Sequence, residues 1–243
     1  MYKSTKACFT TLSLSALFFA GHAMASDAHS SAGAGPEKDQ IRAIVKNLVT
    51  DNQSFVKGNK EAHFAEIIKG QKPRATVVTC SDSRVHTKAL DKDPEGDLFM
   101  IRDIGNQLTT AEGSVEYGVR HLHTPLLLVI GHSSCGAVKA AMGDYAGIEA
   151  PIKRELDTIK VPKKNATDNK EVMAGVEANV NNQIAFAMEK FAPEIKAGKL
   201  AVMGAVYDFR NDYNQGHGKL VITNINGDTD AAKIKAAGIL PAK

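Results

Sequence analysis

Residues 125–140 read PLLLVIGHSSCGAVKA, an apolar run that ends in a short polar segment and continues into small residues. The run over 125–131 predicts a buried strand, and the small residues over 133–142 predict a helix directly after it. A buried strand followed by a helix is the repeating unit of a parallel sheet covered by helices. This stretch therefore favours an α/β fold.

The alternation of strands and helices continues in both directions along the chain. Buried strands are predicted over residues 75–80, 97–101 and 200–207, and helices over 115–122 and 172–191. A last short strand over 220–223 can return antiparallel at an edge. We therefore expect a single α/β domain with a mostly parallel central sheet, helices on its faces and an antiparallel edge strand.

An N-terminal helical arm is predicted before the first strand. Apolar residues recur there at helical spacing and form one stripe, at Ile41, Ile44, Val45, Leu48 and Val49. A second, short helix is predicted over 60–69 and ends at Gly70.

The first 25 residues have the pattern of an export signal. Lys3 and Lys6 precede an apolar stretch over 9–20, and residues 23–25 (AMA) supply small residues for cleavage. The stretch is shorter than the roughly 20 apolar residues that span a membrane. We expect a signal peptide over 1–25, a flexible lead-in over 26–36 and one folded domain over 37–243. The protein would then be exported, to the periplasm in a Gram-negative source.

The composition excludes several classes of protein. With 43% apolar and 23% charged residues, the chain is of the globular type. Its 30 basic and 27 acidic residues are well mixed, which gives no basic surface for nucleic acid or for a membrane. Cleavage would remove Lys3, Lys6 and Cys8 and leave a nearly neutral chain with two cysteines, too few for a disulfide framework.

Two predicted strand ends carry residues that can do chemistry. Cys80 ends one strand, and His132 and Cys135 follow another, so all three can meet at the carboxyl edge of the sheet. Two thiolates and one imidazole make a catalytic zinc set with a fourth position for water or substrate. A disulfide or inert buried cysteines are the alternatives, and the placement at two strand ends favours zinc. We further expect His132 and Cys135 on one helical turn, with the helix N-terminus lowering the pKa of the Cys135 thiol.

Asp82 and Arg84 lie just after the first of these cysteines. An aspartate beside a metal can become its fourth ligand, and an arginine two residues later can hold that carboxylate away. Asp82 would then accept a hydrogen bond from water or hydroxide on the zinc. A surface ion pair of little energetic value is the simpler interpretation, but the position beside Cys80 favours a catalytic one.

Together these motifs resemble the β-class carbonic anhydrases over residues 52–208. The matching blocks are 80–85 (CSDSRV), 97–99 (DLF) with Arg102, 105–106 (GN), 116–117 (EY) and 131–138 (GHSSCGAV). The resemblance implies one zinc ion per subunit on Cys80, His132 and Cys135, with Asp82 and Arg84 as the catalytic dyad. It implies reversible hydration of carbon dioxide to bicarbonate and a proton by hydroxide on the zinc. It also implies a homodimer or homotetramer, with the active site near the subunit interface and the N-terminal helix on the partner.

The resemblance assigns substrate contacts to further positions. Gln71 matches a glutamine that donates a hydrogen bond to substrate. Phe99, Ile104 and Tyr117 match positions that line the apolar pocket for carbon dioxide, partly from the neighbouring subunit. The Gly136 backbone can supply another donor. Plain core packing is the alternative for the three apolar positions.

The chain departs from the family at one regulatory feature. Some members have an inhibitory bicarbonate pocket around a tryptophan three residues before the first zinc cysteine. Val77 occupies that position here, although Arg102 and Tyr207 match the other two places of the pocket. We therefore expect an open site with water as the fourth ligand. His86 is a candidate proton shuttle, and an ordinary loop histidine is the alternative.

Three other functions compete with this interpretation. A carbon disulfide or carbonyl sulfide hydrolase could use the same zinc scaffold, and the resemblance does not separate it from a carbonic anhydrase. A purely structural zinc site has no need of Asp82 and Arg84. A thiol redox protein is disfavoured because Cys80 and Cys135 do not form a C-x-x-C motif.

Overall fold

The computed structural model describes residues 37–240. The predicted signal peptide and lead-in, residues 1–36, lie outside the described residues. The described residues divide into two units, 37–60 and 61–240. The described part of the first is essentially the helix α1 (Glu37–Gly58), and the second contains the sheet.

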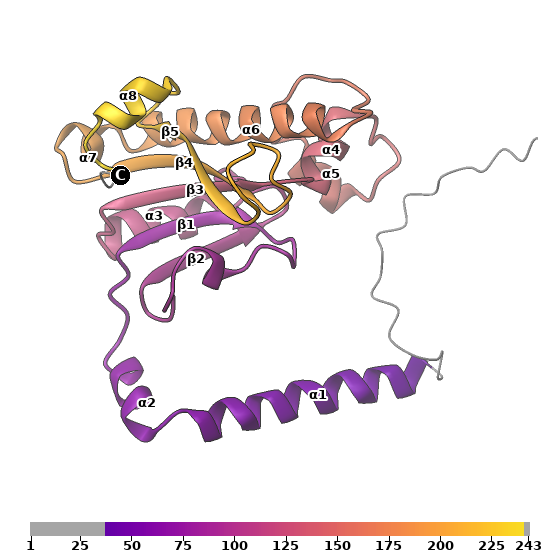
Figure 1. Cartoon of the computed structure of the whole chain (residues 1–243), viewed down its shortest axis with the longest axis vertical. Coiled ribbons are helices and arrows are strands. Elements are labelled where there is room, and N and C mark those ends of the chain that lie inside the picture. Colours follow the sequence, from indigo (N-terminus) through magenta and orange to yellow (C-terminus); the bar gives the residue numbers. More distant parts are fainter. Residues whose placement is uncertain (1–36, 241–243) are drawn as a thin grey trace, which may run out of the picture. The chain divides into compact units, whose positions relative to one another are not determined.

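Five strands of the second unit form one sheet in the order β2-β1-β3-β4-β5 (Figure 1). The first four strands along the chain run parallel, and β5 pairs antiparallel with β4 at an edge. This confirms the predicted α/β fold. The strands are β1 (Ala75–Cys80), β2 (Leu98–Asp103), β3 (Leu126–His132), β4 (Ala201–Asp208) and β5 (Lys219–Ile225).

A long helix, α6 (Asn169–Lys190), covers one face of this sheet and runs along β3 and β4 (Figure 1). The helix lies close to the strands because glycine occupies the strand positions below it. A Cβ atom at Gly204 would come within 2.7 Å of Val180 Cγ1, and one at Gly131 within 2.7 Å of Val176 Cγ1. An apolar cluster fills the space between α6 and this face of the sheet. The helix α3 (Glu112–Glu116) adds Val115 to it, and the π-helical turn η2 (Tyr117–His121) adds Val119.

The opposite face of the sheet has its own apolar cluster. Strand residues such as Val77, Ile130 and Ala205 are fully buried there. The short helix α8 (Ala231–Ala236) packs Ile234 against this cluster.

A third apolar cluster lies at the carboxyl end of the sheet. The helices α4 (Gly136–Met142) and α5 (Ala150–Leu156) contribute to it together with the N-terminal part of α6. Cys80 and Cys135 are members of this cluster. The remaining described helices are α2 (Glu61–Ile68), the 3₁₀ turn η1 (Thr87–Ala89) and α7 (Ala192–Lys196).

The structure differs from the predicted helices at several places. The helix after β3 begins at Gly136 and not at residue 133, because Ser134 has a φ of 55° and Cys135 is extended. The short helices α5, α7 and α8 were not predicted, since five to seven residues hardly complete two helical turns. Proline near the start of α5 and α7, and Asp230 as the N-cap of α8, are the local signals that mark them.

A buried polar network fixes the segment after β2 against α6. Gln107 donates to Asn179 Oδ1 at 2.8 Å and accepts from Gln183 Nε2 at 2.9 Å. Asn179 Nδ2 in turn donates to Gly105 O at 2.8 Å. Because these side chains are buried and satisfy one another, the network gives the segment a single conformation.

The helix α1 is amphipathic, as predicted, and buries none of its residues. The apolar side chains on its stripe are 51–66% exposed, at Ile41, Ile44, Val45, Leu48, Val49 and Val56. Between residues 37 and 240, no helix is both long and apolar enough to cross a membrane.

Candidate metal centre

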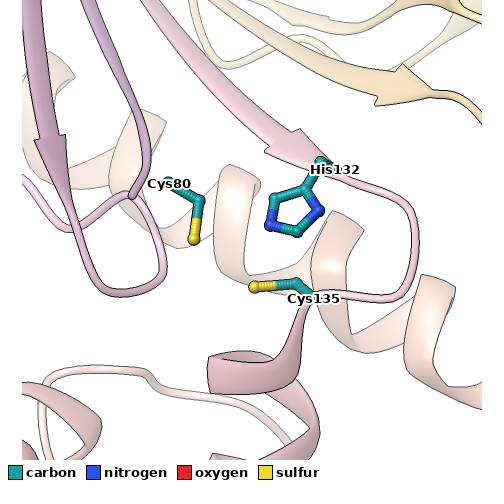
Figure 2. A group of neighbouring side chains, drawn as sticks. All are labelled: Cys80, His132 and Cys135. Atoms are coloured by element: carbon teal, nitrogen blue, oxygen red, sulfur yellow. The ribbon is translucent and has the colours of Figure 1, made fainter. Parts of the chain in front are cut away.

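The carboxyl ends of β1 and β3 bring two cysteines and a histidine together. Cys80 is the last residue of β1, His132 is the last of β3, and Cys135 directly precedes α4. All three are at most 5% exposed, and one potential ligand atom from each lies within 4.8 Å of the other two. Figure 2 shows both sulfur atoms and one ring nitrogen directed toward a common point. Bonds from zinc to sulfur and nitrogen are about 2.0–2.3 Å long, so one ion fits this spacing.

The two ring nitrogens of His132 differ in their hydrogen bonding. Nδ1 lies 2.9 Å from Ser133 O, so the hydrogen bond assigns the ring proton to Nδ1. Nε2 is buried and has no hydrogen-bond partner within residues 37–240. Burying an acceptor without a partner costs free energy, and a metal ion would remove that cost. The residues therefore fit zinc.

Cys80 and Cys135 are both free thiols, so they are available to bind a metal ion. They do not form the disulfide that was the alternative interpretation. A hydrogen bond from Cys135 lowers the pKa of the Cys80 thiol. The backbone N–H groups of Gly105 and Asp82 also donate to this sulfur, against the opposing effect of burial. The chain therefore favours a thiolate at Cys80 even without metal.

The thiol of Cys135 behaves differently from the prediction. Its interaction with Cys80 and its burial raise its pKa well above the usual range. Backbone N–H groups of Val138 and Ala137, at the start of α4, act in the predicted direction but are outweighed. Metal binding would displace the proton that this raised pKa holds on the Cys135 sulfur.

The end of β4 anchors the loop between His132 and Cys135. Ser133 N–H donates to Tyr207 O at 3.1 Å, and the Ser133 hydroxyl donates to Asp208 Oδ1 at 2.7 Å. Asp208 is completely buried and also accepts the N–H groups of Asp212 and Tyr213 at 3.0 and 2.9 Å. Burial acts to raise the pKa of Asp208, but these donors hold it below its usual value. Sequence analysis missed Asp208; the acidic residue that ends its apolar strand is the available signal.

Asp82 and Arg84 form a forked pair beside the metal ligands. Arg84 Nε donates to Oδ1 of Asp82 at 2.9 Å and Nη2 donates to Oδ2 at 2.7 Å. The Arg84 backbone N–H donates to Oδ1 as well, at 2.9 Å. These hydrogen bonds lower the pKa of Asp82 to about 2 despite its partial burial. Oδ2 lies 3.9 Å from Nε2 of His132, so the carboxylate borders the metal site while it faces Arg84.

Arg102 holds the backbone that carries Cys80 and Asp82. Its Nε donates to Cys80 O at 3.1 Å and its Nη2 donates to Asp82 O at 2.7 Å. Val77 is fully buried within the sheet, and Tyr207 packs edge-on against Phe209. In this chain Arg102 thus fastens the loop of the first ligand.

Four of the predicted substrate contacts have different positions relative to the three potential metal ligands. Gln71 is in an exposed segment between α2 and β1. Phe99 pairs in register with Thr76, four residues before Cys80, and packs on the half-exposed ring of Tyr117 at 5.9 Å. Within one chain these two rings are therefore not at the metal ligands. Gly136 directly follows Cys135 as the first residue of α4.

Two other residues named from the sequence have clear positions. Ile104 packs against the apolar cluster that contains the two cysteines. His86 precedes η1, and its Nδ1 accepts a hydrogen bond from Lys88 N at 3.1 Å.

Asp103 is a second carboxyl that sequence analysis missed, and it is partly buried. It ends β2 and is the register partner of Cys80. Burial raises its pKa to about 7, against the effect of hydrogen bonds from Gln107 N and the Thr110 hydroxyl at 2.7 and 2.8 Å. An acidic residue directly after an apolar strand is again the signal that could have found it.

The similarity to known proteins agrees with this geometry. Residues 75–214 match the family model described as carbonic anhydrase. The chain is 30% identical over 182 residues to carbonic anhydrase 2 of Mycobacterium tuberculosis, which covers 68% of this chain and 87% of the relative. A tetrameric β-carbonic anhydrase from Sordaria macrospora superposes with a TM-score of 0.63 at 25% identity, over 74% of this chain and 96% of that one. The chain belongs to the β-class carbonic anhydrases.

Other carbonic anhydrases match in the same way. The enzyme of Mycolicibacterium smegmatis is 32% identical over 152 residues, 59% of this chain and 74% of the relative. A Coccomyxa β-carbonic anhydrase shares the fold with a TM-score of 0.62, over 78% of this chain and 90% of that one at 21% identity. The chain is thus an enzyme of the carbonate dehydratase class, zinc lyases that hydrate carbon dioxide. Because the relatives named here are all carbonic anhydrases, the carbon disulfide and carbonyl sulfide alternative has no support.

Replacing Arg84 with alanine is expected to raise the pKa of Asp82 from about 2 toward its usual 3.8, because the forked hydrogen bonds are lost. The folded-state pKa of Asp82 lies below its unfolded value, so the pair stabilises the fold above about pH 4. That contribution disappears as the pH falls toward 2, and Arg84→Ala should make the loss smaller. A carbon-13 NMR titration of the Asp82 carboxyl in zinc-free protein measures the shift.

Arg74→Ala is the matched control for this titration. Arg74 pairs with Asp91 and Asp97 and not with Asp82, so its removal should leave the pKa of Asp82 at about 2. An Asp82 pKa that stays at about 2 in Arg84→Ala would contradict the assignment of the shift to the forked pair.

Proposed function

We propose that this chain hydrates carbon dioxide reversibly to bicarbonate and a proton, with one zinc ion per subunit on Cys80, His132 and Cys135. The observation that carries the proposal is the buried Nε2 of His132, which has no hydrogen-bond partner in the described part of the chain and lies beside two free thiols. Family membership supports the reaction, and this donor set supports the metal. Three protein ligands leave a fourth position open, as catalytic zinc sites do.

Asp82 and Arg84 supply the acceptor that orients the attacking water. When bound, zinc supplies Lewis acidity that makes water a nucleophile near neutral pH. Oδ1 of Asp82 already accepts two hydrogen bonds from Arg84, whereas Oδ2 accepts one and retains a lone pair. With its pKa at about 2, the carboxylate stays ionised and accepts a hydrogen bond at Oδ2 throughout the neutral range.

Arg84 also keeps the metal position open. A carboxylate that binds metal must turn an oxygen away from its other partners. Both oxygens of Asp82 are engaged by the Arg84 guanidinium, so turning Asp82 onto the metal would break charge-assisted hydrogen bonds. Water, and not Asp82, is therefore the proposed fourth ligand.

The substrate pocket is proposed to form between subunits. Phe99 and Tyr117 make one aromatic patch, and Tyr117 is 47% exposed. Because this patch is not at the metal ligands of its own chain, we assign it to the site of a neighbouring subunit. Ile104 and the Gly136 backbone would line the site from the chain that holds the metal, and Gln71 would donate a hydrogen bond to the substrate.

Zinc analysis and stopped-flow hydration of carbon dioxide, from neutral to alkaline pH, test the proposed function. The wild type should hold one zinc per subunit and be active. His132→Ala and Cys135→Ser should lose both zinc and activity, since each removes a ligand. Asp82→Asn should keep its zinc and lose activity by about a hundredfold, the size of a lost proton acceptor.

Asp93→Asn is the control, because Asp93 is an exposed carboxylate in the loop after η1. It should keep both zinc and activity. A wild-type protein that carries zinc but does not hydrate carbon dioxide at alkaline pH would refute the proposed reaction.

We also propose a homodimer or homotetramer in which α1 covers a second subunit. The support is the exposed apolar stripe on α1 and the tetramer named for the Sordaria relative. Leu48→Glu should shift the protein to smaller species in analytical ultracentrifugation, because it places a charge on that stripe. Thr50 lies two positions along and so on the opposite side of the helix. Thr50→Glu should leave the assembly unchanged, and equal effects of both variants would contradict this arrangement.

Export to the periplasm is proposed from residues 1–25. Their basic start, apolar stretch and small residues before position 26 have the order of a signal peptide. Mass spectrometry of the protein purified from its own host should show a mature chain that begins at Ser26. A retained N-terminus would contradict both the cleavage and the proposed location.

A further inference from the structure

We propose that Phe209 is a positioning residue that orients Arg84 and His132 for the reaction. The roles of these two residues rest on the proposed function, whereas the geometry that joins them to Phe209 does not. Phe209 lies outside the sequence motifs discussed above, as the first residue after β4.

The ring of Phe209 contacts both residues. The Arg84 guanidinium carbon lies 4.9 Å from the ring centroid. The imidazole of His132 stacks on the same ring, with centroids 6.0 Å apart and planes inclined by 27°. One aromatic side chain directly after β4 thus joins the proposed metal ligand on β3 to the arginine that follows β1.

The backbone around Phe209 is held independently of Arg84. Directly before it, the buried Asp208 accepts hydrogen bonds from Ser133 and from two backbone N–H groups. Directly after β4 the chain is tied again, because Phe209 O lies 3.1 Å from Nδ1 of His217 and Gly218 N–H donates to Asp208 O at 2.8 Å. The Tyr207 ring also packs edge-on against Phe209 at 5.7 Å. The ring is therefore held in place, and Arg84 and His132 pack against it.

Arg84 needs this contact with Phe209 because much of its side chain faces water. Its side chain is 52% exposed. Apart from its bonds to Asp82, it has one long hydrogen bond to the described residues, from Nη2 to Ser134 O at 3.4 Å. An exposed ion pair alone contributes little, partly because a long side chain loses rotamer freedom when it forms. An aromatic face attracts the guanidinium and removes water from one of its sides. The ring thus selects the Arg84 orientation that points its fork at Asp82.

Phe209 also contacts His132, one of the potential metal ligands. The hydrogen bond between Nδ1 and Ser133 O sets which nitrogen of this buried ring is bare. Stacking on Phe209 is a second contact that holds the plane of the ring and keeps Nε2 directed at the thiols. Phe209 itself touches no reacting atom, so its effect passes through Arg84 and His132.

The Arg84 Nε–H resonance in proton–nitrogen NMR spectra of the zinc-loaded and zinc-free protein tests this directly. In the wild type, the ring current of Phe209 should move this resonance upfield, and its hydrogen bond to Asp82 should slow exchange with water. Phe209→Leu should move the resonance downfield and speed its exchange. Phe209→Tyr keeps a ring and should retain the wild-type spectrum.

Activity provides the second readout. Phe209→Leu should lower kcat/KM about fivefold, the factor that corresponds to a cation–π contact of about 1 kcal/mol, with zinc content unchanged. Phe209→Tyr should restore the rate. Phe191→Leu is the matched control, since that buried ring lies under Arg120 at 5.2 Å and in another apolar cluster. It should lower thermal stability but leave the Arg84 resonance and kcat/KM per folded protein unchanged.

The outcomes separate this proposal from the proposed function. An Arg84 resonance unchanged in Phe209→Leu would overturn the positioning role, even if activity falls. A resonance at its random-coil position in the wild type would overturn it without any variant. If the wild type does not hydrate carbon dioxide, the proposed function fails, and the resonance still shows whether Phe209 orients Arg84.

Discussion

The parallel pairing of β1 with β3 is the constraint on which the metal centre depends. Thr79 pairs with Ile130, so both strands end at the same level and present Cys80 and His132 side by side. The chain supplies no such proximity locally, because the two residues are more than fifty positions apart. Glycine at two strand positions lets α6 lie close to the sheet, and this buries the strands on that face. The apolar core thus sets the positions of the two ligands, and the polar contacts then refine them.

Hydrogen bonds tie the loops of the site to neighbouring strands and to α6, which fixes the positions of those loops. Arg102 holds the carbonyl groups of the first loop, Asp208 holds the second loop through Ser133, and Asn179 holds the carbonyl group of Gly105. The pKa of each carboxyl depends on its own surroundings. Hydrogen bonds to arginine keep Asp82 ionised, whereas burial raises the pKa of Asp103 to about 7 only one strand away. Similar side chains thus acquire different protonation behaviour from their positions alone.

The loop between His132 and Cys135 shows where inference from spacing was insufficient. An interval of three residues favours one helical turn, but Ser134 adopts a left-handed backbone and α4 begins only at Gly136. The two ligands still converge, because β4 holds Ser133 from the side. The expected lowering of the thiol pKa is found at Cys80 and not at Cys135. This difference depends on which sulfur donates to the other, and spacing along the chain contains no such information.

The sequence by itself determined the α/β class, the parallel strands and the residues able to bind metal, because apolar periodicity and donor types are local properties of the chain. It also identified Asp82 and Arg84 as a pair, since two residues that close can meet without the rest of the fold. Only the tertiary structure decided which nitrogen of His132 is bare and which thiol loses its proton first. Only it brought Asp208 and Phe209 to the site. Those contacts join residues from different strands, and their geometry exists only once the sheet has formed.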